Sequence, residues 1–341
     1  MKRASNLLTH VADPDNLRLA AWKAAKGKRH SQEVMTWSAR MEEHILPLRQ
    51  QILEGQVMVG NYRYFKVYEP KERQICASVF GEQVLHHALM NVCHPYFEKA
   101  QIFDSYASRN GKGTYGALER AKKYTNRYAW YLKLDVKKFF ESISHEVMVR
   151  QLARMFKDAA LVGIFEQIIH SYEASPGLPA EGTKAGRGLP IGNLTSQYFA
   201  NHYLNGLDRF IKEKCGCKAY VRYMDDMVLW HDDKTVLLRL LNEIERFIAL
   251  EIDCELKPFA LNRTKTGLPF LGYHIFPHHV RLLQKSKQRF IRKLHIIEKG
   301  YHSGKWNEAK CQRRVLPLLA FTGHADAKNL RESILSRLKG Q

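Results

Sequence analysis

The chain has 341 residues, of which 45% are hydrophobic and 26% are charged. A chain of this length and composition buries a sizeable core, which excludes general disorder and a mini-protein scaffold. Its 54 Lys and Arg residues against 34 Asp and Glu give a formal net charge of +20. This excess is larger than solubility alone requires, so we expect an anionic polymer as partner.

The predicted elements begin with helices. Residues 16–51 mix polar and apolar residues at helical spacing around a basic cluster, which predicts a basic helical arm within residues 1–55. Aromatic and β-branched residues between Gly55 and Gln74 predict a β-hairpin. One helix is expected over 82–97, ending near Pro95 because proline lacks the backbone donor that a helix needs. Another is expected over 145–172.

Two further segments predict strands that carry carboxylates. Residues 130–136 alternate, so Lys133 and Asp135 face away from the apolar side chains of that strand. Further along, the apolar runs 220–224 and 227–230 are separated only by Asp225 and Asp226. Two residues between two strands are typical of a tight hairpin.

The C-terminal part of the chain is strongly basic. From Arg281 onward there are fifteen Lys and Arg residues against four Asp and Glu. This predicts a separate basic helical lobe over residues 281–341, after a central part over 56–280.

Cysteine usage and hydropathy indicate the compartment. The six cysteines are scattered without a CxxC pair, which is typical of reduced thiols. The first 22 residues lack a long apolar stretch, and no apolar run approaches the length that spans a bilayer. We therefore predict a cytoplasmic protein without a membrane partner.

The paired acids at the predicted hairpin indicate a cation site. Two adjacent carboxylates repel each other and both are drawn from water, which is costly unless a cation compensates. Mg²⁺ prefers hard oxygen ligands, and two such ions about 3.5–4 Å apart assist an in-line displacement at phosphate. An isolated Asp-Asp pair is more often simple turn chemistry. Here the third strand-borne carboxylate, Asp135, and the basic chain favour the metal site.

Five segments in chain order resemble motifs of reverse transcriptases. Residues 223–226 resemble the catalytic hairpin of that family, and residues 134–140 resemble its first carboxylate motif. Residues 68–73, 188–197 and 270–273 resemble the fingers segment, the nucleotide-pocket motif and the primer grip. The resemblance implies an α+β right-hand polymerase with fingers, a palm built on an antiparallel sheet and a helical thumb. It also implies an RNA-directed DNA polymerase, a nucleotidyltransferase.

The nucleotide-pocket motif resembles one branch of that superfamily. Ile191-Gly192 followed by Ser196-Gln197 resembles reverse transcriptases of diversity-generating retroelements, as does the 323–325 block. This implies a bacterial, archaeal or phage-encoded enzyme that copies a template-repeat RNA into adenine-mutagenised cDNA for mutagenic retrohoming. The implied partners are template RNA, the RNA/cDNA hybrid, deoxynucleotides and a small basic oligomeric accessory protein. Two alternatives remain: another bacterial reverse transcriptase, of retron, group II intron or abortive-infection type, and a non-catalytic RNA-binding scaffold.

The resemblance also assigns roles to individual residues. The three aspartates are the expected catalytic residues and, with the backbone carbonyl of Val136, the ligands of two Mg²⁺ ions, for which Mn²⁺ is a substitute. The expected metal ligands are therefore Asp135, Val136, Asp225 and Asp226. The expected nucleotide-binding residues are Lys71, Arg73, Phe140, Ile191, Gly192 and Gln197. The expected nucleic-acid-binding residues are Lys285, Lys287, Arg289, Arg292 and Lys293.

Several of these roles have plainer alternatives. Phe140 falls where the family places an aromatic ring that excludes a 2′-hydroxyl, with Phe139 in the core, but core packing explains both rings as well. Lys71 and Arg73 fit a phosphate clamp or a solvated basic turn equally. The basic residues of the C-terminal lobe are likewise explained by a solvent-exposed helix face without a binding role.

Two further residues carry hypotheses about chemistry. Ile191 stands where related polymerases carry a Gln that bonds near the incoming nucleotide, so we hypothesise that it lowers fidelity. Lys257 and Lys265 both fall near the position of the family's lysine that protonates pyrophosphate, and the sequence does not choose between them.

Overall fold

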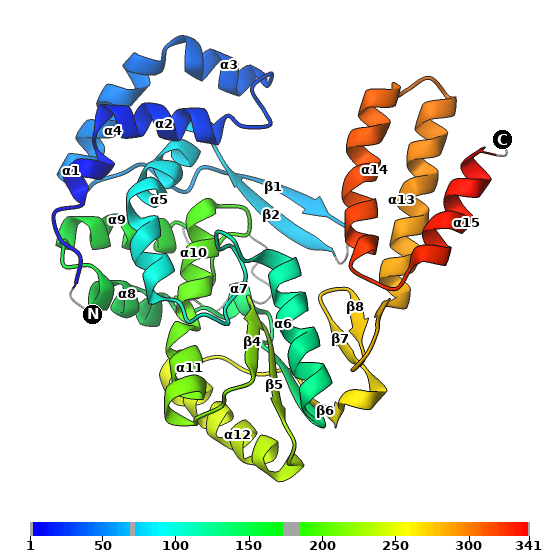
Figure 1. Cartoon of the computed structure of the whole chain (residues 1–341). Coiled ribbons are helices and arrows are strands. Elements are labelled where there is room, and N and C mark those ends of the chain that lie inside the picture. Colours follow the sequence, from blue (N-terminus) through cyan, green and yellow to red (C-terminus); the bar gives the residue numbers. More distant parts are fainter. Residues whose placement is uncertain (1–2, 69–71, 173–184, 340–341) are drawn as a thin grey trace.

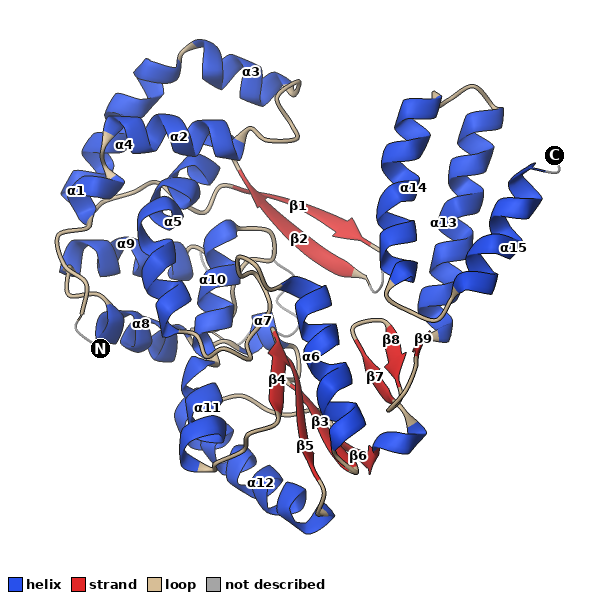
Figure 2. Ribbon diagram, viewed as in Figure 1, coloured by secondary structure: helices blue, strands red, loops and turns tan. Residues whose placement is uncertain are grey.

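The computed structural model describes residues 3–68, 72–172 and 185–339. N-terminal helices gather on one side and C-terminal helices on the other, with an antiparallel sheet in the central part between them (Figure 1; Figure 2).

The N-terminal segment forms four helices, α1 (Leu8–Val11), α2 (Pro14–Ala24), α3 (Gln32–Ala39) and α4 (Met41–Glu54). Asp13 caps α2 by accepting hydrogen bonds from two backbone amides, and Ser31 caps α3 by accepting one from the amide of Val34. Small residues on α2, with Leu17, form its buried face, and α2 packs against α5. The predicted arm is therefore helical, as expected, and docked on the core.

The predicted hairpin forms later in the chain than expected. Strands β1 (Tyr62–Val67) and β2 (Arg73–Ser78) pair antiparallel, with Tyr62 opposite Ser78. The hairpin reaches from the N-terminal helices toward the C-terminal ones (Figure 1). Lys71 lies outside the described residues, and Arg73 begins β2.

Helix α5 (Phe80–Ala100) does not end at Pro95, so that prediction is wrong. Proline removes one helical hydrogen bond, but the last turn is held by tertiary packing. Phe97 is buried there, and its ring contacts the rings of Phe156, Tyr198 and Phe199 at centroid distances of 5.7, 5.5 and 6.2 Å. Helix α6 (Gly113–Arg127) follows.

Four strands form the central sheet in the order β4-β5-β3-β6, with antiparallel neighbours. They are β3 (Trp130–Asp135), β4 (Tyr220–Tyr223), β5 (Asp226–His231) and β6 (Ala260–Arg263). Alternate side chains enter different cores: Leu132 and Leu134 pack into the larger helical core, whereas Tyr131 packs into a second core with α6 and β7–β9. The predicted alternation of β3 is confirmed.

The expected helix over 145–172 is two helices, α8 (His145–Met155) and α9 (Ala159–His170), preceded by the short α7 (Phe139–Ser142). The chain breaks because Asp158 caps α9 through the amide of Leu161. The Lys157 amide donates to the carbonyl of Ala4 at 2.7 Å, so the N-terminal residues pair with the break.

The rest of the central part of the chain is helical. It contains α10 (Leu194–Tyr203), α11 (Asn205–Arg209), the π-helix η1 (Phe210–Lys214), α12 (Lys234–Phe247), the π-helix η2 (Ile248–Ile252) and the 3₁₀ turn η3 (Thr264–Thr266).

The C-terminal elements begin with a small sheet, β7 (Leu268–Phe270), β8 (Tyr273–Ile275) and β9 (Val280–Leu282). Three helices follow, α13 (Gln284–His302), α14 (Glu308–Gly323) and α15 (Lys328–Lys339). The His324 ring of the 323–325 block stacks on Tyr115 of α6 at a centroid distance of 3.8 Å. This contact ties the C-terminal helices to the central part.

Two sequence expectations concern the whole chain. Within the described ranges, no helix has the length and apolar character needed to cross a membrane. All six cysteines are free thiols in the structure, as predicted.

Buried His202 predicts how stability depends on pH. Burial, with the positive charges of Arg222 and Arg209, lowers the pKa of His202 from 6.5 to about 4. Between these values the unfolded chain binds a proton that the folded chain does not, so stability falls as pH falls below about 6.5. We expect the wild type to lose about 2 kcal/mol more than His202→Gln between pH 7 and pH 5, measured by urea unfolding. Equal losses in the two proteins would contradict this.

Candidate active site

Strand pairing brings the three predicted aspartates to one end of the central sheet. Asp135, the last residue of β3, lies directly opposite Asp226, the first residue of β5. Directly opposed residues of antiparallel strands have Cα atoms about 4.5–5.5 Å apart. Asp225 lies in the adjoining turn, close enough to Asp135 for the charge of that carboxylate to raise the pKa of Asp225. We call these three residues the carboxylate cluster.

The turn of this hairpin differs by one residue from the expectation. Tyr223 pairs with Asp226, so the two loop residues are Met224 and Asp225, and Asp226 belongs to the strand. Met224 has a φ of +56°, a left-handed conformation that is uncommon for residues other than glycine. Two-residue hairpin loops require such positive φ values.

Burial and mutual repulsion raise the pKa values of two aspartates in the carboxylate cluster. Burial raises the pKa of Asp226 to about 6, against the opposing effect of Lys133. The pKa of Asp225 is also raised, chiefly by burial and then by the charge of Asp135. Charge is therefore costly at both positions of the hairpin.

Two lysines partly compensate the cluster. The Nζ of Lys257 lies 2.6 Å from Asp135 Oδ1, and the Nζ of Lys133 lies 3.2 Å from Asp226 Oδ2. The Lys133 ammonium also donates to the carbonyl of Pro269 at 2.8 Å. Lys265, the other candidate lysine, is exposed in η3. Lys133 was not among the predicted site residues, although the strand alternation places it on the face of Asp135.

The donor set fits a divalent cation in its chemistry. Asp226 Oδ1 is buried and has no hydrogen-bond partner in the described part of the chain, and a hard cation prefers such an oxygen. In the same ranges, however, no three His, Cys, Asp or Glu side chains are already arranged to hold a metal ion. Asp135 and Asp226 instead form ion pairs with lysines. The metal ligands therefore stay a prediction. Val136, the fourth proposed ligand, is buried next to Asp135 and forms a bridge with Leu256.

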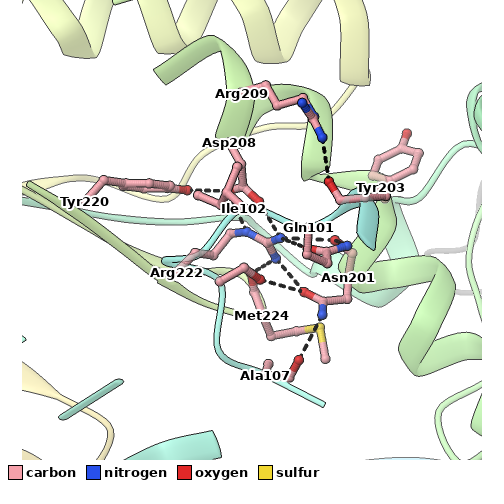
Figure 3. A network of polar contacts seen from close by, with 12 residues as sticks. Gln101, Ile102, Ala107, Asn201, Tyr203, Asp208, Arg209, Tyr220, Arg222 and Met224 are labelled. Carbon is pink, nitrogen blue, oxygen red and sulfur yellow. Dashed lines mark hydrogen bonds and ion pairs between the residues drawn. The ribbon is translucent and has the colours of Figure 1, made fainter. Parts of the chain in front are cut away.

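A fully buried arginine, Arg222 of β4, lies next to the hairpin turn (Figure 3). The Nε and Nη2 atoms of Arg222 donate to the two carboxylate oxygens of Asp208 at 2.8 and 2.6 Å. Its Nη1 donates to Asn201 Oδ1 and to the carbonyl of Met224, both at 2.9 Å. Tyr220 also donates to Asp208, at 2.8 Å. The network thus holds the strained residue that precedes Asp225.

The buried ion pair of Arg222 and Asp208 was not among the sequence predictions. The available signal was an arginine inside an otherwise apolar strand, which indicates a buried partner because an unpaired buried charge is costly.

Two of the predicted nucleotide-binding residues, Ile191 and Phe140, accept backbone hydrogen bonds. The Cys76 amide of β2 donates to the carbonyl of Ile191 at 2.8 Å, and the Leu189 amide donates to the carbonyl of Phe140 at 2.8 Å. Gly192 lies against the same strand, because a Cβ built on it would lie 2.5 Å from the Cys76 carbonyl oxygen. Phe140 is half-buried, and Phe139 is buried in the core as expected.

Other predicted residues lie elsewhere. Gln197 is exposed on α10, where its Oε1 accepts a bond from Ser108 at 3.4 Å. The five basic residues of the C-terminal lobe all lie on α13, and Lys285, Lys287 and Arg292 are exposed. Their binding role stays a prediction.

Comparison with known proteins identifies a family whose matched region contains the carboxylate cluster. The model of the family described as reverse transcriptase (RNA-dependent DNA polymerase) matches residues 71–275. Protein YkfC of Escherichia coli (strain K12) is 23% identical over 332 residues, covering 84% of this chain and 85% of the relative. The putative COX1/OXI3 intron 2 protein of Saccharomyces cerevisiae is 20% identical over 294 residues, covering 69% of this chain and 32% of the relative.

The fold is also similar to a solved structure. Telomerase from Candida tropicalis, in complex with a TWJ fragment of telomeric RNA, has a TM-score of 0.52 at 12% identity, covering 89% of this chain and 59% of that chain. The chain therefore spans about three fifths of the telomerase and about a third of the yeast intron protein. The similarity confirms the expected right-hand polymerase fold of helices around an antiparallel sheet.

Proposed function

The chain belongs to the reverse transcriptase (RNA-dependent DNA polymerase) family, and on that premise we propose that it is an RNA-directed DNA polymerase. The 3′-hydroxyl of a primer attacks the α-phosphate of a deoxynucleotide paired with an RNA template, and pyrophosphate leaves. The observation that carries this proposal is the strand register that sets Asp135 opposite Asp226 within the matched region. A non-catalytic RNA-binding scaffold gains nothing from clustered, partly buried carboxylates beside an anionic ligand.

The carboxylate cluster and the backbone carbonyl of Val136 are the proposed ligands of two Mg²⁺ ions, for which Mn²⁺ is an alternative. When bound, these ions activate the attacking hydroxyl and stabilise charge on the leaving pyrophosphate. The fold of the chain sets the positions of the three carboxylates. Strand pairing fixes Asp135 against Asp226, and the Arg222 network holds the turn that carries Asp225.

Lys257 is the proposed proton donor to pyrophosphate, in preference to Lys265. Its ammonium group lies at the carboxylate cluster, 2.6 Å from Asp135 Oδ1. The ion pair between Lys133 and Asp226 opposes the effect of burial, which raises the pKa of Asp226.

The proposed nucleotide pocket lies between β2 and the segment that ends at α10. Ile191 and Gly192 contact β2, and Phe140 is tied to the same segment through Leu189. We propose that the Phe140 ring excludes a 2′-hydroxyl and that Lys71 and Arg73 hold the triphosphate. We also propose Gln197 as a nucleotide-binding residue, because it lies on α10, which begins within the 188–197 motif. Residues Lys285, Lys287, Arg289, Arg292 and Lys293 of α13 are the proposed contacts to template and primer phosphates.

Primer extension on an RNA template tests the function. We expect the purified chain to extend a DNA primer with deoxynucleotides and Mg²⁺, and Asp225→Asn to reduce the rate at least about 100-fold. The matched control is Asp15→Asn, which neutralises an exposed carboxylate on α2 and leaves extension unchanged. Equal extension by Asp225→Asn and wild type would refute the proposed site.

A finer proposal concerns the biological type. We propose error-prone copying of a template-repeat RNA, as in diversity-generating retroelements, with a small basic oligomeric accessory protein. The Ile191-Gly192 and Ser196-Gln197 pairs of the pocket motif support it. The similarity to intron proteins favours the second candidate, another bacterial reverse transcriptase of intron or related type. A near-duplicate repeat pair beside the gene, differing at template adenines, distinguishes the two.

Ile191 gives this finer proposal a direct test. An isoleucine cannot make the hydrogen bond that a glutamine makes near the nascent pair, and one such bond is worth about 0.5–1.5 kcal/mol. We therefore expect Ile191→Gln to lower errors opposite template adenine by about 2–10-fold, measured by sequencing the products. Leu250→Gln is the control, because Leu250 is 81% exposed in η2. An unchanged error frequency in Ile191→Gln would contradict the hypothesis.

A further inference from the structure

A cavity lies away from the carboxylate cluster. It has a volume of about 360 Å³, and its walls come from α8, α10, α11 and the end of α12 with η2. No residue of the carboxylate cluster or of the proposed nucleotide pocket lines it. Helices α8, α11 and α12 lie at the left and bottom of Figure 1, and α13–α15 lie at the right. The function proposed above uses none of this cavity.

Three polar atoms of lining residues are buried without a hydrogen-bond partner in the described part of the chain. They are Asn205 Oδ1, Gln151 Oε1 and His202 Nδ1. Asn205 and His202 are each only 8% exposed. Buried polar groups in folded proteins nearly always find a partner. The side chains that carry these atoms therefore hold unused hydrogen-bonding capacity beside the cavity.

The charged groups of the cavity are mainly positive. Arg150 and Arg154 of α8 and Arg209 of α11 line it, and Glu251 is the only acidic residue among the described residues that do so. One Arg209 nitrogen donates to the carbonyl of Ala100 at 2.9 Å, which fixes that side chain at the cavity. Guanidinium groups suit phosphate oxygens, to which they donate two parallel bonds.

The remaining wall is apolar. The Phe247 ring lines the cavity and stacks on Phe210 at a centroid distance of 4.6 Å. Met155 and Ile252 complete this side. A bare phosphate would satisfy the arginines but would leave the apolar wall and the unpartnered atoms without contacts. Cavities of this size accommodate an ordinary small organic ligand.

We propose that this cavity binds a 5′-phosphorylated nucleoside. The phosphate is held by Arg150, Arg154 and Arg209, and the base lies against Phe247 with its exocyclic amino group toward Asn205 and Gln151. The ligand is either a free nucleotide or the 5′-terminal nucleotide of an RNA, and the two share this chemistry. The site is separate from the one at which deoxynucleotides are proposed to react.

Calorimetric titration of the full chain with AMP tests the proposal. We expect binding with a Kd below about 1 mM, and binding at least about tenfold weaker for adenosine or inorganic phosphate alone. The double variant Arg150→Gln/Arg154→Gln is expected to weaken AMP binding at least about tenfold. Both side chains are exposed, so we expect the variant to fold like the wild type. An unchanged melting temperature verifies this.

The control removes the same charge elsewhere. Arg239→Gln/Arg246→Gln changes two exposed arginines of α12 that do not line the cavity, and we expect AMP affinity within about twofold of wild type. Asp225→Asn should also bind AMP normally, which separates this site from the carboxylate cluster. Absence of AMP binding at millimolar concentration, equal binding by the two double variants, or loss of binding in Asp225→Asn would each overturn the proposal. None of these results depends on polymerase activity.

Dinucleotides distinguish the two sources. If the RNA terminus is the ligand, a 5′-phosphorylated dinucleotide binds at least as tightly as AMP, and its 5′-hydroxyl counterpart binds at least about tenfold more weakly. If free nucleotides are the ligand, the phosphorylated dinucleotide binds at least about tenfold more weakly than AMP. Either result supports the site, whereas binding of both dinucleotides with the affinity of AMP contradicts it, because the 5′-phosphate then contributes nothing.

Discussion

Arg222→Leu is expected to lower the free energy of unfolding by about 3–5 kcal/mol and to abolish primer extension. The substitution leaves the Asp208 carboxylate buried without its ion-pair partner, which is the usual source of losses of this size. It also removes the donor at 2.9 Å from the Met224 carbonyl. Urea unfolding measures the first effect and single-turnover extension the second.

A double variant separates stability from positioning. In Arg222→Leu/Asp208→Leu both buried charges are gone, and apolar replacement of both partners is often close to neutral. We expect it to recover part of the lost stability, although Tyr220 then lacks its acceptor. Extension should stay lost, because nothing holds the Met224 carbonyl and the turn before Asp225. Recovery of both stability and extension would show that Arg222 has only a structural role.

The sequence predicted the parts of the site that depend on local pattern. Alternation over 130–136 placed Lys133 and Asp135 on one face, and two apolar runs around an acid pair predicted the β4–β5 hairpin. Both predictions hold in the structure. The turn was misplaced by one residue, because pairing of Tyr223 with Asp226 is set by the strand register and not by composition.

The parts that were missed depend on tertiary contacts. Asp208 lies on α11, and only packing of α11 against β4 brings it to Arg222. The choice between Lys257 and Lys265 likewise needed the backbone bond from the Lys257 amide to the carbonyl of Asp135, which no spacing rule specifies. Pro95 remained inside a helix because aromatic contacts outweigh one lost hydrogen bond.

Gly192→Ala is the second substitution with a large expected effect. Gly192 has a φ of +136°, a backbone conformation that residues other than glycine rarely adopt. A Cβ added to it would lie 2.5 Å from the Cys76 carbonyl oxygen. Because that neighbour is backbone, β2 must move away. The movement breaks the bond at 2.8 Å between the Cys76 amide and the Ile191 carbonyl. We expect a stability loss of about 1–3 kcal/mol and a KM for deoxynucleotides at least about tenfold higher.

The control for this substitution isolates the close approach from the backbone strain. Gly216 also has a positive φ, +66°, but no atom lies within 4 Å of the position of its Cβ. Gly216→Ala should therefore cost only about 1 kcal/mol, with an unchanged KM. If both variants destabilise the chain equally and neither alters KM, then the contact between β2 and the pocket segment does not position the nucleotide. A raised KM in Gly192→Ala alone instead identifies the approach of β2 to residues 191–192 as a wall of the nucleotide pocket.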